Sequence, residues 1–409
     1  MISYTLYDLA LEFKKAKLWM ELYDTQLFAV RHSDGTIGYC CVMGRMGEHF
    51  ALAVYPGDTG LDAYRAMGHD RSKMDYIEQH ENALLQDCVM VSFQNKRELL
   101  EQEIDEVTAY MHARGLTLRG RKAYPQFERF RPHHYPWRLD DENDRTHLKE
   151  AMEAALEVSE RLEEMAPEEL GFTEGAPYDR SIPLIERENG AFVWKTIALG
   201  PPRKPVYPSP EITDDIALAK LGQCNKKGGV WACDIFMHLE AISDEEAVGN
   251  IVENPISAPY FPYLLLIVNN ESGKMLGVEV VKELSDEAAL ISSVINTAMS
   301  TGKPEKIFVL NDRAKAFFKK LAPQLGATLA KRKRLPLLEE ARYGLTELFG
   351  DQEEAAEEFD DLMAMLSDPN EYACMPDETL AVLRQMSANT VLPPEVAQLI
   401  ERECKKRGM

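Results

Sequence analysis

The chain has 409 residues, of which 45% are hydrophobic and 28% are charged, and its formal net charge is −22. This balance is typical of a globular protein and excludes wholesale disorder and collagen-like repeats. The apolar run of residues 263–268 is far shorter than the roughly 20 residues of a membrane helix, so no membrane partner is expected. The negative charge opposes long-range attraction to nucleic acid and to anionic lipid.

The seven cysteines are odd in number and include no Cys-x-x-Cys pair. This spacing argues against a zinc ribbon and against a disulfide framework. The N-terminus lacks a basic segment followed by an apolar core, so no secretory signal is expected. Free thiols without a signal then indicate a cytoplasmic location. The sequence also lacks a P-loop, a dinucleotide fingerprint and a nucleophile elbow.

Residues 1–165 are expected to form an N-terminal α/β domain. Strands are predicted at residues 27–32, 37–43, 49–55 and 87–93, and helices at residues 4–18, 95–114 and 141–165. Asp140 and Asp141 precede the last of these helices and can cap its first turn. The glycines at positions 44, 47, 57 and 60 are interpreted as turn residues.

Two further segments differ in composition from the domains. Residues 166–230 are expected to be a connector rich in Pro and Gly, with one short strand near residues 191–198. Residues 351–409 are expected to be an acidic helical tail, because residues 351–368 contain eight acids and no base. Helices in this tail are predicted near residues 377–387 and 394–406.

Residues 231–350 are expected to form a second α/β domain with the element order β-β-β-α-β-α-β-α. Strands are predicted at residues 231–240, 262–269, 274–281, 306–310 and 327–331, and helices at residues 285–300, 312–324 and 337–349. Hairpins followed by alternating helices and strands indicate a mixed sheet that is covered on both faces.

Asp234 and Asp312 are the candidate chemical groups in this domain. Asp234 lies within an apolar strand, where a carboxylate is costly unless it is paired or bound to a metal ion. Asp312 directly follows the strand at residues 306–310. If the two strands are parallel neighbours, both carboxylates meet at one edge of the sheet, where a divalent metal could bind.

The segment that contains these residues resembles the ribonuclease H-like fold of retroviral integrases and related transposases. The resemblance rests on the element order, on Trp231 and Asp234 in the first strand, on the hairpin at residues 269–274, and on the strand that precedes Asp312. It implies three carboxylates that hold two divalent metal ions, Mg²⁺ or Mn²⁺, for phosphodiester chemistry.

The chain departs from that family at two points. The family's Asp-Asn-Gly is here Asp312-Arg313-Ala314, and the third acid would be Glu339 or Glu340, which follows Asp312 more closely than the family usually allows. Both glutamates also lie well away from the centre of the apolar stripe of their predicted helix. These departures favour a degenerate member without activity.

Two basic stretches have two interpretations each. Lys331, Arg332, Lys333 and Arg334 could contact a phosphate backbone, or they could be the solvated end of a surface strand. Residues 114–138 interleave arginines with aromatic residues. That pattern is typical of base stacking and also of a half-buried strand with outward arginines, and the strand is the favoured interpretation.

The N-terminal half also resembles uncharacterised bacterial proteins that carry domains of unknown function. The resembling stretches are residues 37–44, 55–61 and 125–137. Taken together, the sequence favours a cytoplasmic bacterial protein of α/β class that binds a protein partner or itself, without a cofactor and without catalysis. The alternative is a divalent-metal nuclease or phosphodiesterase that uses Asp234, Asp312 and Glu339 or Glu340.

Overall fold

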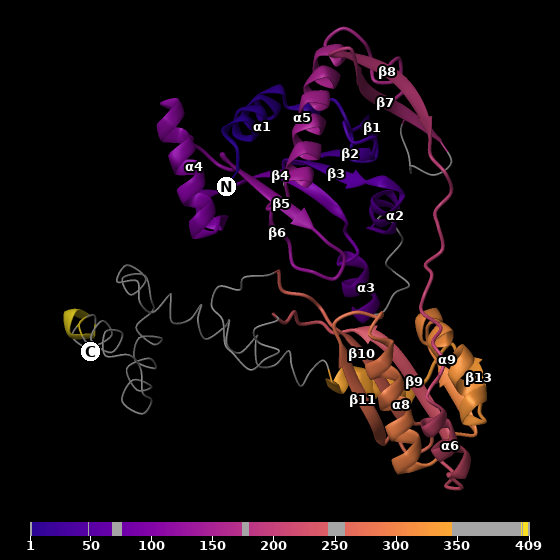
Figure 1. The fold of residues 1–409 in the computed structure, drawn as a ribbon. Coiled ribbons are helices and arrows are strands. Elements are labelled where there is room, and N and C mark those ends of the chain that lie inside the picture. Colours follow the sequence, from indigo (N-terminus) through magenta and orange to yellow (C-terminus); the bar gives the residue numbers. More distant parts are fainter. Residues whose placement is uncertain are drawn as a thin grey trace. The chain divides into compact units, whose positions relative to one another are not determined.

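The computed structural model describes residues 2–47, 49–67, 76–173, 180–243, 258–345, 402 and 404–407 (Figure 1). The chain divides into one unit of residues Met1–Leu335 and a second unit of residues Pro336–Met409. The first unit contains two mixed β-sheets with helices packed on them, which confirms the predicted α/β class.

The first sheet has eight strands in the order β6-β5-β4-β3-β2-β1-β7-β8. Neighbouring strands are antiparallel except for β1 and β7, which are parallel. The strands are β1 (Phe28–Arg31), β2 (Ile37–Met43), β3 (Ala51–Pro56), β4 (Cys88–Gln94), β5 (Tyr124–Phe130), β6 (Trp137–Arg138), β7 (Ser181–Glu188) and β8 (Ala191–Ala198). The four strands predicted in residues 1–165 are all present.

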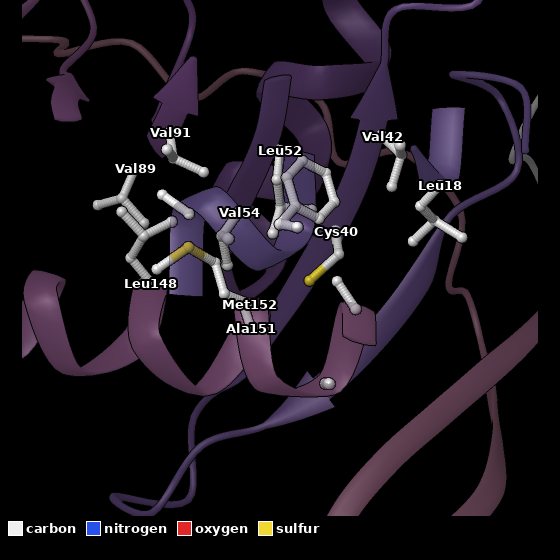
Figure 2. Packing of buried hydrophobic residues seen from close by; sticks show 14 of the residues in the cluster. Leu18, Cys40, Val42, Leu52, Val54, Val89, Val91, Leu148, Ala151 and Met152 are labelled. Atoms are coloured by element: carbon white, nitrogen blue, oxygen red, sulfur yellow. The ribbon is translucent and has the colours of Figure 1, made fainter. Parts of the chain in front are cut away.

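Alternation along these strands places a hydrophobic core on each face of the sheet. The helices of this region are α1 (Tyr4–Ala16), α2 (Gly57–Met67), α3 (Tyr76–Ala83), α4 (Glu101–Arg114) and α5 (Glu142–Leu162). Figure 2 shows Leu148, Ala151 and Met152 of α5 against valine, leucine and cysteine side chains of β2, β3 and β4. The carboxylate of Asp141 accepts hydrogen bonds from the backbone N–H groups of Asn143 and Asp144, as the predicted cap requires.

Two features of this sheet differ from the prediction. Gly57 and Gly60 were expected in a turn, but they lie in the first turn of α2. A Cβ atom at Gly60 would lie 2.7 Å from the backbone carbonyl carbon of Tyr55, so glycine permits this close approach of helix and strand. Residues 181–198, within the expected connector, form the β7–β8 hairpin, of which only β8 was predicted.

The second sheet has five strands in the order β11-β10-β9-β12-β13. The strands are β9 (Val230–Met237), β10 (Tyr263–Asn269), β11 (Met275–Val281), β12 (Lys306–Val309) and β13 (Thr328–Lys331). The condition set for a carboxylate site, parallel pairing of the strands before Asp312 and around Asp234, is met, because β12 pairs with β9 in parallel. Strand β10 is antiparallel to both of its neighbours, β9 and β11.

Helices α6 (Asp215–Gln223), α8 (Glu287–Thr301) and α9 (Asp312–Leu325) share one core with this sheet. Trp231, Cys233 and Ile235 of β9 belong to that core. Ala232 and Asp234, which point to the opposite face, are also fully buried. Strand β9 is therefore buried on both faces, as its nearly continuous apolar sequence indicated.

In the second unit, residues 336–345 are helical, as are residues 402 and 404–407. The predicted tail helix at residues 377–387 lies outside the described residues, and so does most of the one at residues 394–406. Within the described ranges, no helix has the length and apolarity that a bilayer crossing demands.

Candidate functional site

Asp234 occupies the middle of β9 and has no exposed surface. Its Oδ1 atom accepts a hydrogen bond of 2.6 Å from the side-chain amide of Asn311 and one of 2.9 Å from the backbone N–H of Ile235. Hydrogen bonds from neutral donors stabilise a carboxylate that has been removed from water. The sequence predicted the carboxylate of Asp312 beside Asp234, whereas the structure has the side-chain amide of Asn311 there.

Asn311 is held in this orientation by bonds at both ends of its amide. Its Oδ1 atom accepts from the backbone N–H of Ala314 at 2.8 Å and thereby caps helix α9. Its Nδ2 atom also donates to the carbonyl oxygen of Ile235 at 3.0 Å. Because a backbone donor and a backbone acceptor fix the two ends, the amide presents its nitrogen to Asp234. An N–H donor cannot ligate a metal ion.

Asp312 follows Asn311 in the chain but has a different environment. Its side chain is 70% exposed, and its carboxylate pairs with the ammonium group of Lys331 at 2.8 Å. This pairing lowers the pKa of the Asp312 carboxyl. Of the two residues in this turn, Asn311 bonds to Asp234 and Asp312 does not.

The other predicted site residues are distributed over two units. Glu339 and Glu340 belong to the second unit, on the helix of residues 336–345, where Glu339 is half-buried and Glu340 is exposed. Lys331 to Arg334 are all exposed, and the Arg332 guanidinium lies 4.4 Å from the centre of the Phe308 ring. Among the described residues, no group of three or more His, Cys, Asp or Glu side chains is arranged to hold a metal ion.

The carboxyl end of β9 is a packed interface. Arg313 donates to the carbonyl oxygen of Ile235 at 3.2 Å and pairs with Glu81 of α3, and both charged side chains are less than 15% exposed. The Arg313 guanidinium also lies 4.8 Å from the ring centre of Tyr263. In open α/β sheets this edge is where ligands usually bind. Here the first sheet's helix α3 contributes a carboxylate to it.

A hollow of the described surface lies elsewhere, beside strand β5 of the first sheet. A groove of about 680 Å³ runs between the start of α4, strand β5 and residues 135–140. Its apolar lining includes Leu100, Phe127, Tyr135, Trp137 and Leu139. Its charged lining consists of the acids Glu101, Glu103, Asp105, Glu106, Glu128 and Asp140 and the bases Arg138 and Arg145. The groove therefore combines aromatic surface with an excess of negative charge.

Glu103 is tied to the scaffold of the groove. It accepts a hydrogen bond from the backbone N–H of Leu100 at 2.9 Å, which closes the first turn of α4. The side-chain amide of Gln126 on β5 donates to both of its carboxylate oxygens, at 3.2 and 3.3 Å. Burial nevertheless raises the pKa of Glu103, because these bonds only partly replace the lost water.

Glu128 lies on β5, two residues after Gln126, and its environment differs from that of Glu103. No described residue forms a hydrogen bond or an ion pair with its carboxylate. Its cross-strand neighbour on β6 is Arg138, but that guanidinium bonds to Asp140 and Gln102 instead. Burial, together with repulsion from Glu103, raises the pKa of Glu128 to about 7.

The basic and aromatic stretch of residues 114–138 contributes one wall of this groove. Its half-buried strand is confirmed as β5, in which Phe127 is buried. The arginines do not all point outward, since Arg129 is only 13% exposed and pairs with Asp87 at 2.7 Å. The sequence did not predict the acids of α4 as site residues, because a helix face rich in Glu is typical of an ordinary solvated surface.

Comparisons with known proteins identify two domains. Residues 4–177 match the family model described as a domain of unknown function, DUF7309. Residues 217–346 match a second model with the same description, DUF6930. A search of curated proteins finds no match. The first match ends close before the β7–β8 hairpin, and the second extends from α6 to the helix of residues 336–345.

Proposed function

We propose that this chain of two domains of unknown function is a non-catalytic binding or assembly protein, and that it holds a protein partner in the groove along β5. The observation that carries this proposal is the groove itself, with its volume of about 680 Å³ and its lining of Tyr135, Trp137 and acidic side chains. Aromatic residues are enriched at protein interfaces because they bury a large area at a small cost in conformational entropy. The acidic lining disfavours nucleic acid as the occupant.

The second domain supports a role without catalysis. Its resemblance to the ribonuclease H-like fold is supported by the element order and by the parallel pairing of β9 and β12. The amide of Asn311 beside Asp234, and the pairing of Asp312 with Lys331, favour a degenerate member of that fold. We therefore assign this domain a structural or assembly role.

A bacterial, cytoplasmic origin is part of the same proposal. The resemblance of the N-terminal half to bacterial proteins supports the source. The described cysteines are free, and Cys40, Cys41 and Cys88 are buried in the cores on the two faces of the first sheet. Unbridged thiols are in keeping with a reducing compartment.

The groove is tested by comparing the partners of two tryptophan variants of the full chain. Trp137→Ala removes an aromatic wall of the groove, and Trp194→Ala removes a half-buried tryptophan of β8 that does not line it. Tagged protein is cross-linked in cells, and co-purified proteins are quantified by mass spectrometry. We expect partners that are retained by Trp194→Ala and lost with Trp137→Ala. Equal recovery of every partner with both variants would contradict the proposal.

The competing phosphodiesterase hypothesis needs its own assay. Purified protein is incubated with single- and double-stranded nucleic acids and Mn²⁺, beside Asp234→Asn and Asp312→Asn. The second variant matters because Asp312 is exposed, so its replacement leaves the fold intact. Metal-dependent cleavage that both variants lose would overturn the non-catalytic proposal.

A further inference from the structure

One side of strand β5 is only partly occupied. On its inner side, β5 pairs with β4 along its whole length, from Tyr124 to Phe130. On its outer side, β6 pairs only with Glu128 and Arg129. In the described part of the chain, no strand pairs with residues 124–127 on this side, and residues 125–128 line the groove. An open edge of this kind accepts an added strand from another chain.

The walls of the groove limit what such a segment can be. The start of α4 and residues 135–140 both line the groove, and Leu100 and Trp137 are apolar members of this lining. Pro125 has no backbone N–H, so residues 124–127 contain one backbone donor fewer than an ordinary strand. Side chains of the occupant therefore have to provide much of the recognition.

Glu128 indicates which side chain is recognised. It is half-buried and has no cation within the described chain, although Arg138 lies directly across the strand pair. A partly buried carboxylate without a cation is unfavourable, and it attracts a donor that carries positive charge. Glu103 is already bonded to Leu100 and Gln126, so Glu128 is the carboxylate of this pair that is open to a ligand.

We propose that the occupant of the groove is an extended segment of a partner protein that places a lysine or arginine side chain on Glu128. This inference rests on the proposed function and names the ligand of the same groove. The apolar part of the basic side chain packs between Leu100 and Trp137, and the backbone of the segment runs along β5. Glu103 adds negative charge at the same place.

The test measures binding of two labelled heptapeptides to the full chain by fluorescence anisotropy. The basic probe is Thr-Lys-Val-Arg-Thr-Lys-Val, and the neutral probe has Gln at each basic position. The variants are Glu128→Gln, which keeps the shape of the side chain, Trp137→Ala, and Glu164→Gln. Glu164 is an exposed acid outside the groove, so this control removes the same charge from the same protein.

We expect the basic probe to bind the unmodified chain about tenfold more tightly than the neutral probe, because only the basic probe offers a charged donor to the Glu128 carboxylate. Glu128→Gln should abolish most of that difference, Trp137→Ala should weaken both probes, and Glu164→Gln should change neither.

Two other results separate this inference from the proposed function. Equal binding of both probes, unaffected by Glu128→Gln but weakened by Trp137→Ala, would overturn the charge recognition and leave the groove as a binding site. Failure of both probes to bind would also overturn the inference, while the partners lost from Trp137→Ala in cells would still support the proposed function. If Trp137→Ala weakened neither the binding of the probes nor the recovery of partners from cells, both the inference and the proposed function would be overturned.

Discussion

The exchange Asn311→Asp tests whether the Asp234 environment is a structural pair or a latent metal site. Aspartate caps a helix as well as asparagine does, so the bond to the N–H of Ala314 and the start of α9 are preserved. What is lost is the amide donor to Asp234 and to the carbonyl oxygen of Ile235. In its place, a second carboxylate faces a carboxylate that has no exposed surface.

The expected cost follows from these contacts. Removing a hydrogen bond to a buried charged group costs about 1.5–3 kcal/mol, and leaving a buried charge without compensation costs about 3–5 kcal/mol. We therefore expect Asn311→Asp to lower the free energy of unfolding by about 3–5 kcal/mol at pH 7. Asn311→Ala loses the same donor and the cap but adds no charge, so it should cost less, about 2–4 kcal/mol.

The two variants also differ in their dependence on pH. The paired carboxylates of Asn311→Asp share one site, so repulsion raises the pKa of one of them above its unfolded value. The folded variant then binds more protons than the unfolded chain, and its stability falls as the pH rises from about 4 to 7. Asn311→Ala has no such added dependence.

Urea denaturation at pH 5 and pH 7, with and without Mn²⁺, measures these differences. A loss below about 0.5 kcal/mol at both pH values would refute the proposed role of the amide. Strong stabilisation of Asn311→Asp by Mn²⁺, absent from the unmodified chain and from Asn311→Ala, would show that one substitution restores a metal site. Stabilisation of the unmodified chain by Mn²⁺ would favour the phosphodiesterase hypothesis.

Three further predictions concern the scaffold, and urea denaturation checks each of them. Burial lowers the pKa of His133 to about 4, so the unfolded chain takes up a proton on this residue first as the pH falls from about 6.5. About 3 kcal/mol of stability is therefore lost by pH 4. His133→Asn should flatten this decline, and an unchanged slope would refute the assignment. Glu81→Gln leaves Arg313 buried without its carboxylate and should lower the free energy of unfolding by about 3–5 kcal/mol. Adding Arg313→Met to this variant should recover part of that loss. Additive losses from the two substitutions would contradict the pairing. Met152→Ala opens a cavity in the core of Figure 2 and should lower the free energy of unfolding by about 2–5 kcal/mol. The exposed control Glu164→Ala should lower it by less than about 0.5 kcal/mol. Similar losses for the two variants would contradict the packing.

The second sheet illustrates how far local sequence determines the fold. Its five strands and its helices α8 and α9 were predicted within a few residues, because alternation and helical periodicity are properties of short segments. The apolar strand around Asp234 was recognised in the same way, and the structure buries it on both faces. The parallel pairing of β9 with β12, on which the carboxylate site was made conditional, is present in the sheet.

The β7 strand shows where local composition misleads. Pro183 and the surrounding Pro and Gly residues indicated a connector, yet residues 181–188 pair with β8 along their whole length. Strand β1 pairs with β7 only at Leu184 and Ile185, so the missing N–H of Pro183 disrupts no bond there. Only the sheet as a whole determines whether a proline lies at a position that needs a donor.

The candidate sites depended on side-chain directions that a sequence does not contain. Asn311 and Asp312 are adjacent in the chain, but the turn into α9 sends one to Asp234 and the other to Lys331. His32 and His147 come from distant segments of the chain, and their rings stack with centres 4.1 Å apart. Glu103 and Glu128 also come from separate segments, and their negative charges repel each other. The sequence by itself determined the elements and much of their order, because those follow from local periodicity. The tertiary structure decided which polar groups meet, because that depends on strand register and on the rotation of each helix about its axis.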